Sequence, residues 1–301
     1  MKKGIFYNSK KSSCSIYESG LMCFNALKKS NKYFLAYTED TLYKNNFDFH
    51  IFNYHHTVNN WINNSNINNC LGKKYCIVLE IGFENNLLPY TPDIFDKYLI
   101  LDPTHESDNK FISFPRPLED FEVKNKEIKN ITIGSFGFAT EDKKWEEIII
   151  AAKKDFDNAI VKINIPRGNY VGQQDISMHN AINNIKKECA GTNIKLELTH
   201  NYMDKNELIE WCSNNTINFF PYYRNMPGLA AVTDQAISAE RPLLVTNNKT
   251  FRHILKYIKP YPEIGIKQAI EQNFQGVLQM KKDWSSSSFF EKFERILYGN
   301  L

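Results

Sequence analysis

The sequence predicts an α/β fold made of two domains, and three observations support this prediction. Short apolar runs alternate with amphipathic segments along the 301 residues, which is typical of parallel strands connected by helices. A segment that bears prolines and is then highly charged interrupts the alternation between Phe114 and Asn130, as a linker does. Beyond it the alternation starts again. We therefore expect two Rossmann-like domains that face each other across a cleft, a favoured place for ligands.

The first domain is expected to span residues 1–118. Its first helix is predicted over Ile16–Lys28, where apolar residues recur at helical spacing. Its strands should be short and buried, because each candidate is an apolar run followed by polar or turn residues. These candidates are Gly4–Tyr7, Tyr33–Tyr37, Phe47–Phe52, Tyr75–Leu79 and Lys97–Leu101.

A linker is expected over residues 119–130, a second domain over residues 131–280 and a docked terminal helix over residues 281–301. The serines at Ser285–Ser288 can cap that last helix, whose apolar residues form one stripe. The strands predicted for the second domain are Ile131–Ser135, Ala159–Ile165, Ile194–Leu198, Ile217–Phe220 and Leu243–Thr246. The helices predicted between them are Lys143–Lys154, Ile176–Cys189, Asp204–Cys212 and about Leu229–Ala239.

Composition argues against several classes of protein. Hydrophobic residues make up 42% and charged residues 24%, near the averages for globular proteins. The net charge is +3 without a lysine or arginine block, so no nucleic-acid partner is expected, although a local basic cleft stays open. The six cysteines form no C-x-x-C pair, which argues against a disulfide framework and a metal centre. With neither a signal peptide nor a run of about 18 apolar residues, we expect a cytoplasmic protein, and attachment to a membrane surface stays open.

The most informative segment runs from Ile217 to Thr246. It reads as a strand, a polar loop over Pro221–Gly228, a helix and a second strand. The loop would deliver a helix N-terminus just beyond the carboxyl end of a buried strand, where free backbone N–H groups favour an anion such as a diphosphate. Asp234, about one and a half turns into the predicted helix, could reach a sugar hydroxyl. The same pattern also fits an ordinary αβ unit with a glycine turn.

A second glycine turn opens the second domain, with Gly134, Ser135 and Gly137 between a strand and a helix. Two glycines and a hydroxyl let a backbone approach a ligand closely, although a simple turn would look the same. The turn lacks the third glycine of a dinucleotide fingerprint and the G-K-[ST] of a P-loop. NAD and Walker-type ATP binding are therefore poorly supported.

Several basic and aromatic side chains are candidates for contacting a phosphate, sugar or base. Lys143 and Lys144 could meet a phosphate, although lysines on a helix surface are usually just solvated. Arg167 follows a strand and could pair with phosphate. The candidates for stacking on a sugar or base are Tyr202, Tyr222 and Tyr223.

The first domain offers candidates for acid–base chemistry and acceptor binding. His55 and His56 are adjacent, so in an extended segment they point in opposite directions, and one could act as a general base or contact a sugar hydroxyl. Glu80, at the carboxyl end of a predicted strand, could do the same for an acceptor hydroxyl. Ser13 and Glu18, around the start of the first helix, could face the acceptor or cap the helix.

No metal or other cofactor is expected. Asp155 and Asp157 have the D-x-D spacing associated with divalent metals and nucleotide sugars. They follow a lysine-rich helix and precede a strand, which indicates a helix-ending loop instead. The sequence also lacks G-x-S-x-G, H-E-x-x-H and a Cys/His nucleophile signature.

Taken together, these features resemble the GT-B glycosyltransferases, and most closely the retaining family 4 type that uses nucleotide sugars. The family's E-x7-E pair is absent, because Met226 and Pro227 stand eight residues before Asp234 and Gln235. The likeness covers the second domain and is only architectural in the first. The matching residues are Phe220-Pro221, Gly228-Leu229, Asp234-Gln235-Ala236 and Arg241-Pro242-Leu243-Leu244-Val245-Thr246.

The resemblance implies a nucleotide-sugar donor site in the second domain. Backbone N–H groups near Gly228, Leu229 and Ala230 would bind the diphosphate, and Asp234 the ribose. The base would lie near Asn201–Leu208. The Gly134–Gly137 turn and Arg167 would lie near the phosphates or the transferred sugar, His55 or His56 would contact the sugar, and Arg224 completes the expected donor set.

The implied activity is transfer of a sugar from a nucleoside-diphosphate sugar to a glycan or lipid-linked acceptor, with retention favoured. A nucleotide-sugar epimerase on the same architecture is one alternative. A non-catalytic protein that binds a nucleotide or sugar is another, motivated by the missing glutamate pair. A lipid-linked acceptor would bring the protein to the inner face of the membrane.

Overall fold

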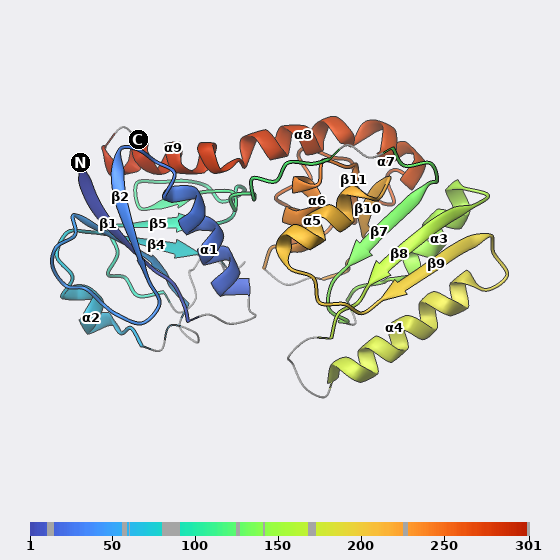
Figure 1. The fold of residues 1–301 in the computed structure, drawn as a ribbon, viewed down its shortest axis with the longest axis horizontal. Coiled ribbons are helices and arrows are strands. Elements are labelled where there is room, and N and C mark those ends of the chain that lie inside the picture. The colour runs from blue at the N-terminus through green and yellow to red at the C-terminus, as the bar shows by residue number, and fades with distance from the viewer. Residues whose placement is uncertain are drawn as a thin grey trace. The chain divides into compact units, whose positions relative to one another are not determined.

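The protein folds into two compact α/β units, as Figure 1 shows for the computed structural model. Unit 1 comprises Met1–Glu119 and Trp284–Leu301 together with Gly228 and Leu229, and unit 2 comprises Asp120–Met226 and Ala230–Asp283. The predicted α/β fold class is confirmed. The structure describes residues 1–10, 15–55, 59, 61–79, 91–124, 127–140, 142–167, 173–224 and 228–299.

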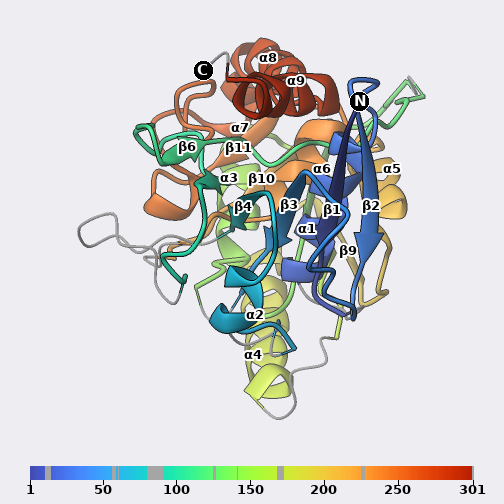
Figure 2. The same cartoon turned by 90° about the vertical axis from the view of Figure 1, so that its left-hand side faces the viewer.

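Unit 1 is built on a parallel sheet whose strands pair in the order β2-β1-β3-β4-β5-β6. Figure 2 shows β2, β1, β3 and β4 following one another in this order. Alternate side chains of each strand face opposite sides, so Phe6 enters the core beneath the helices while Tyr7 enters the core on the other face. The strands are β1 Lys2–Tyr7, β2 Tyr33–Thr38, β3 Phe49–Asn53, β4 Lys73–Val78, β5 Lys97–Ile100 and β6 Phe111–Ser113.

Two long helices cover one face of this sheet. α1 (Ser15–Leu27) and α9 (Ser286–Leu297) pack against each other. From α9, Phe289 and Phe293 are fully buried in the same core as Phe6. The short helix α2 (Asn64–Asn68) contributes Ile67 to the core on the opposite face.

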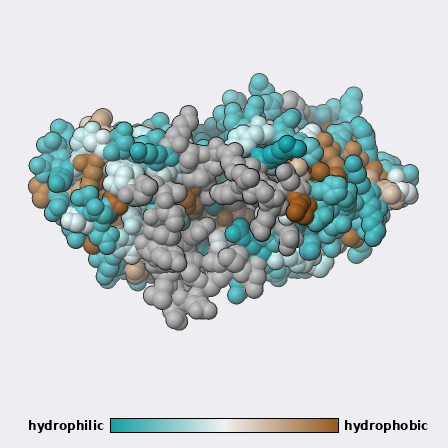
Figure 3. Space-filling model, turned by 90° about the horizontal axis from the view of Figure 1, so that it is seen from below, coloured by the Kyte–Doolittle hydropathy of each residue, from teal (hydrophilic) through white to brown (hydrophobic). Residues whose placement is uncertain are grey.

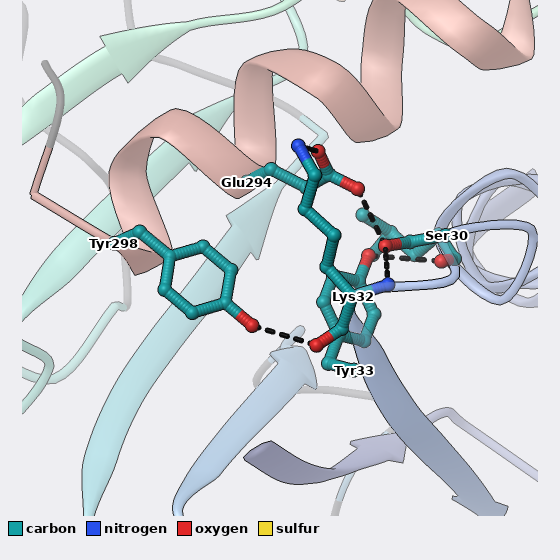
Figure 4. Close-up of polar contacts among 6 residues, drawn as sticks. Ser30, Lys32, Tyr33, Glu294 and Tyr298 are labelled. Carbon is teal, nitrogen blue, oxygen red and sulfur yellow. Dashed lines mark hydrogen bonds and ion pairs between the residues drawn. The ribbon is translucent and has the colours of Figure 1, made fainter. Parts of the chain in front are cut away.

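Polar contacts fix α9 to the turn between α1 and β2, as Figure 4 shows. The Glu294 carboxylate accepts hydrogen bonds from the Ser30 hydroxyl and the Lys32 ammonium, each at 2.5 Å. The Tyr298 hydroxyl donates to the Lys32 carbonyl oxygen at 2.7 Å. The last helix is therefore held in unit 1 by its apolar stripe and by the hydrogen bonds of Glu294 and Tyr298 near its C-terminal end.

Unit 2 is built on a second parallel sheet, of order β11-β10-β7-β8-β9. Helices cover both of its faces, which explains why its strands read as continuous apolar runs. Trp145, Ile148 and Ile163 lie in the core between the sheet and α3. The strands are β7 Thr132–Phe136, β8 Ala159–Asn164, β9 Ile194–Thr199, β10 Ile217–Phe220 and β11 Leu243–Val245.

The helices of unit 2 form a connected series of contacts. α3 contacts α4 and α7, α7 contacts α8, and α6 contacts α5 and α8. A short 3-10 helix, Lys249–Phe251, follows β11. The helices are α3 Glu146–Asp155, α4 Gln173–Cys189, α5 Lys205–Ser213, α6 Val232–Ser238, α7 Ile266–Gln272 and α8 Phe274–Asp283.

Two helices begin later than the sequence predicts. The backbone of Lys143, where α3 was expected to start, instead forms a β-bridge with Tyr222. The Ala230 N–H, expected inside α6, donates to the Thr250 carbonyl oxygen at 3.1 Å. Tertiary contacts thus hold both segments out of the helices. The structure also contains β6, α2, α7 and α8, which the sequence did not predict.

The described part of the chain contains no helix that is long and apolar enough to cross a membrane. On the face shown in Figure 3, the coloured surface is largely hydrophilic, with hydrophobic residues in small separate groups. Scattered apolar residues of this kind are normal on protein surfaces.

Candidate functional site

Two neighbouring strands of unit 2 mark the point where the sheet's connections reverse. β7 pairs with β10 on one side and β8 on the other, and the order runs outward to β11 in one direction and β9 in the other. Open α/β sheets bind ligands beyond the carboxyl ends of two such strands, because the loops that leave them diverge. These loops follow Phe136 and Phe220 and form the candidate donor site.

Tyr222 joins the loops that leave three strands. Its side chain is buried, and its hydroxyl donates to the Phe136 carbonyl oxygen at 3.3 Å. Its backbone forms the bridge with Lys143, and its carbonyl oxygen accepts hydrogen bonds from the Thr246 hydroxyl and the Asn248 amide. The ends of β7, β10 and β11 are therefore connected through a single residue.

The Lys143 ammonium lies at this junction. Its Nζ is 4.9 Å from the ring centroid of Tyr222 and 5.7 Å from that of Trp145, within the range of cation–π attraction. It donates a hydrogen bond to the Phe138 carbonyl oxygen at 2.8 Å. Among the residues that the structure describes, no carboxylate forms an ion pair with it. A partly buried cation that no described carboxylate pairs with is suited to bind an anionic ligand.

The surroundings of Lys143 disfavour its charge. Burial lowers the pKa of the Lys143 ammonium to about 7, although the negative charge of Asp142 opposes this and the positive charge of Arg224 adds to it. Asp142 itself faces Arg224, whose Nε lies 3.8 Å from the carboxylate. A bound anion beside Nζ would favour the charged form of Lys143. The electrostatics therefore favour a phosphate over a neutral group here.

The predicted Gly134–Gly137 turn proves to be only partly at this site. A Cβ at Gly134 would lie 1.9 Å from Asn215 Nδ2, so this glycine makes room for a neighbouring side chain. Ser135 is fully buried within β7, and its hydroxyl has no hydrogen-bond partner among the described residues. Nothing in this packing supports the predicted ligand contacts of these two residues, which stay untested. Gly137 does border the site, because a Cβ there would lie 2.6 Å from Lys143 Nζ.

The residues expected at the diphosphate and ribose lie around the start of α6. The Ala230 N–H donates to the Thr250 carbonyl oxygen, so in this conformation it does not offer the predicted phosphate contact. Gly228 is buried, and Leu229 precedes the helix. Asp234 lies in the first turn of α6, not one and a half turns in, and is 3% exposed. Its contact with a ribose stays a prediction, as do the N–H contacts of Gly228 and Leu229.

Four other predicted donor residues lie on loops that leave the same end of the sheet. Arg167 follows β8, Tyr202 follows β9, and Tyr223 and Arg224 follow β10. Tyr202 and Tyr223 are 64% and 52% exposed, and both arginines are exposed. Because the strands are parallel, their carboxyl ends meet at one edge, and these side chains are accessible to a ligand there.

Asn164 supports this edge, although the sequence analysis did not single it out. It is buried at the end of β8, and its amide donates to the Asn201 carbonyl oxygen at 3.0 Å. Its side-chain oxygen accepts from Thr199, and its carbonyl oxygen accepts from the Gly137 N–H. The sequence signal that could have indicated Asn164 is a polar residue at the end of a mostly apolar strand.

Unit 1 has a corresponding reversal between β1 and β3, since β2 lies beyond β1 and β4 beyond β3. His55 lies two residues after β3, and its N–H donates to Asn59 Oδ1 at 2.8 Å. Glu18 lies in the first turn of α1. Both predicted residues therefore lie on segments next to this reversal.

A buried asparagine pair fixes α1 at the same place. Asn53 Nδ2 donates to Asn8 Oδ1 at 2.7 Å and to the Ile16 carbonyl oxygen at 2.8 Å, and Asn8 Nδ2 donates to the Tyr17 carbonyl oxygen at 3.1 Å. A Cβ at Gly20 would lie 2.2 Å from both asparagine side chains. The absent side chain at Gly20 allows the helix to approach the pair.

Three predicted residues, Ser13, His56 and Glu80, lie outside the described residues. Across the described ranges, no group of three or more His, Cys, Asp or Glu side chains could hold a metal ion. Asp155, from the D-x-D segment, accepts a hydrogen bond from the Lys267 N–H at 3.1 Å. This carboxylate therefore caps the start of α7.

No family model and no curated protein matches this chain, but solved structures do. One, described as trehalose-6-phosphate from E. coli bound with UDP-2-fluoro glucose, matches with a TM-score of 0.63 and 10% identity over 98% of both chains. A glycosyltransferase from Rickettsia africae matches with a TM-score of 0.64 and 8% identity, over 98% of this chain and 97% of that one. An α-glucosyltransferase in complex with UDP and a DNA 13-mer containing an HMU base matches with a TM-score of 0.57 and 13% identity, over 98% and 95%.

The chain has the GT-B fold. Its two parallel sheets agree with those of glycosyltransferases despite identities of 8% to 13%. At such identities the likeness establishes the fold, and the activity has to be argued from the site.

Proposed function

We propose that the protein is a glycosyltransferase that moves a sugar from a nucleoside-diphosphate sugar to a glycan or lipid-linked acceptor. The observation that carries this proposal is the Lys143 ammonium. It lies on the loop after β7, at the reversal of the second sheet, and no described carboxylate pairs with it. A diphosphate is the part of a nucleotide sugar that this environment suits.

The chemistry needs charge stabilisation at that point. In the transfer, the bond between the anomeric carbon and the diphosphate oxygen breaks, and the diphosphate leaves with the electron pair. The acceptor hydroxyl oxygen bonds to the anomeric carbon, and its proton passes to the leaving diphosphate. The Lys143 ammonium would stabilise the negative charge that grows on the leaving diphosphate, so we propose no obligatory metal.

The other predicted residues receive roles consistent with their places. Arg167 and Arg224 would contact the phosphates, and Tyr202 and Tyr223 are exposed enough to stack on the base or sugar. Asp234 would bind the ribose. UDP is the first nucleotide to try, because several matching structures were solved with UDP or a UDP sugar.

The acceptor would bind to unit 1, where His55 and Glu18 lie beside the reversal of the first sheet. We further propose the retaining, family 4 type of reaction. A lipid-linked acceptor would bring the protein to the inner face of the membrane. These finer assignments depend on identifying the acceptor.

The test measures binding of nucleoside diphosphates and their sugars to the purified protein through the shift they cause in its thermal unfolding. A ligand at a hundred times its dissociation constant adds about 2.7 kcal/mol of stability. We expect a shift that is selective for one base and is lost in Lys143→Met. The absence of any shift across the panel would overturn the proposal.

Product analysis then separates the alternatives. Transfer of the sugar to an acceptor supports the proposed activity. Consumption of a nucleotide sugar without acceptor or hydrolysis would indicate an epimerase. Tight binding without turnover over a broad panel of donors and acceptors would indicate a non-catalytic binding protein.

A further inference from the structure

We infer that Tyr222 is a positioning residue that, together with the space left by Gly137, holds the Lys143 ammonium where it meets the donor diphosphate. The inference rests on the proposed function of the site. Beyond that function, it assigns the position of the Lys143 ammonium to the buried ring of Tyr222 and to the lack of a side chain at Gly137.

The ring of Tyr222 is itself held rigidly. It packs against Phe220 and Phe251, with centroid separations of 6.0 and 5.4 Å, and the hydroxyl is tethered to Phe136. Its backbone is fixed by the side chains of Thr246 and Asn248 and by the bridge to Lys143. The ring of Tyr222 is therefore held in a fixed position beside the ammonium.

Lysine needs such a fixed neighbour, because its four-carbon stem is flexible and its ammonium acts as a point charge. The bridge places the Lys143 backbone beside Tyr222, and the ring face then attracts the ammonium at 4.9 Å. Gly137 leaves space beside the ammonium and the Tyr222 hydroxyl. Its φ of 141° favours glycine, and an added Cβ would come within 2.6 Å of Nζ and 3.1 Å of the Tyr222 hydroxyl.

The charged groups around the ammonium come from both loops. Asp142 lies on the loop after β7 and Arg224 on the loop after β10. Tyr222 adds no charge, since burial raises the pKa of its hydroxyl well above the ordinary value. Lys143 is thus the group that titrates near neutral pH here, and a bound diphosphate will favour its protonated form. Affinity for a diphosphate should therefore fall as the pH rises above about 7.

The experiment measures the dissociation constants of UDP and of inorganic pyrophosphate at pH 6 and pH 8.5. The variants are Tyr222→Phe, Tyr222→Leu and Gly137→Ala. Tyr222→Phe keeps the ring but loses the hydrogen bond to the Phe136 carbonyl oxygen, so it should lose less affinity than Tyr222→Leu. Tyr222→Leu and Gly137→Ala should each lose about tenfold in affinity at pH 6, as expected for loss of a cation–π contact, and should show a weaker dependence on pH.

Phe219→Leu is the matched control. Phe219 is a fully buried ring of β10, the strand that precedes Tyr222, and it packs on Tyr261. This variant should lose stability but keep the wild-type affinity and pH dependence. An equal loss of affinity in the control would overturn the inference, because it would show general loosening of β10.

A readout without ligand separates this inference from the proposed function. The lysines are dimethylated with a ¹³C label, and the Lys143 signal is identified by its absence in Lys143→Met. In Tyr222→Leu and Gly137→Ala the ammonium should leave its buried place and meet more water. The pKa read from that signal should therefore rise toward the ordinary value for lysine. If wild type binds neither probe, the proposed function fails, and this titration alone decides the inference. An unchanged titration in both variants would refute it.

Discussion

The Glu294 carboxylate accepts a hydrogen bond from the Ser30 hydroxyl at 2.5 Å, joining the last helix to the turn that follows the first. Its second oxygen accepts from Lys32, whose side chain is 61% exposed while that of Glu294 is 6% exposed. The two partners should therefore contribute unequally to stability.

Replacing Glu294 with alanine should lower the free energy of unfolding by about 2 kcal/mol, because the buried Ser30 hydroxyl would lose its partner. Lys32→Ala should cost less, since water screens an exposed ammonium. Urea unfolding of both variants measures the difference. Equal losses would contradict the unequal roles assigned to the two groups.

Replacing Lys143 with methionine should abolish diphosphate binding and stabilise the ligand-free protein at pH 7 and below. The folded pKa is about 7 and the unfolded value about 10.4, so between these values the unfolded chain binds more protons. Wild-type stability should therefore gain from rising pH in this window, and the advantage of the variant, on the order of 2 kcal/mol at pH 6, should shrink toward pH 10.

Thermal unfolding of wild type and Lys143→Met at matched pH values measures this difference, and Lys144→Met is the control. Lys144 is the adjacent, exposed lysine, so its removal should change neither stability nor binding by much. A destabilised Lys143→Met variant would mean that the ammonium serves the fold and not a ligand.

Gly134→Ala should destabilise unit 2 by about 1–3 kcal/mol, because the new methyl group would overlap the Asn215 amide in a fully packed core. The affinity for UDP of the protein that remains folded should stay unchanged, since Gly134 does not border Lys143. Unfolding by denaturant and calorimetric titration check the two parts. Loss of affinity with unchanged stability would restore Gly134 as a ligand contact.

Asp234→Ala should weaken nucleoside-diphosphate binding by about tenfold if the carboxylate meets the ribose. Pyrophosphate, which has no ribose, should bind the variant as it binds wild type. Comparing the two ligands by calorimetry separates a lost ribose contact from general damage to the site. An equal loss for both ligands would remove Asp234 from its assigned role.

Most strands could be predicted from the sequence, since each is an apolar run bounded by polar or turn residues. β6 has three residues and α2 has five, which is too short for a periodic signal. The starts of α3 and α6 depend on hydrogen bonds to residues distant in the chain, such as that from Ala230 to Thr250. Local sequence does not reveal such contacts.

The site shows the same division. Gly137 belongs to a recognisable glycine turn and Lys143 opens the helix predicted after it, so the sequence could nominate both. Tyr222 was expected to stack on a ligand, yet it is buried and faces Lys143. That pairing arises because β7 and β10 become neighbours in the sheet, and strand order is not readable from one strand at a time.

The position of α9 has a consequence for how the chain matures during translation. The core of unit 1 takes Phe289 and Phe293 from this helix, whereas its strands come from the first 119 residues. The ribosome therefore releases the sheet long before the helix that covers it, with the whole sequence of unit 2 in between. Although α1 is already present, nascent unit 1 exposes the part of the apolar face that α9 covers throughout that interval, the condition in which chaperones act and misassembly begins.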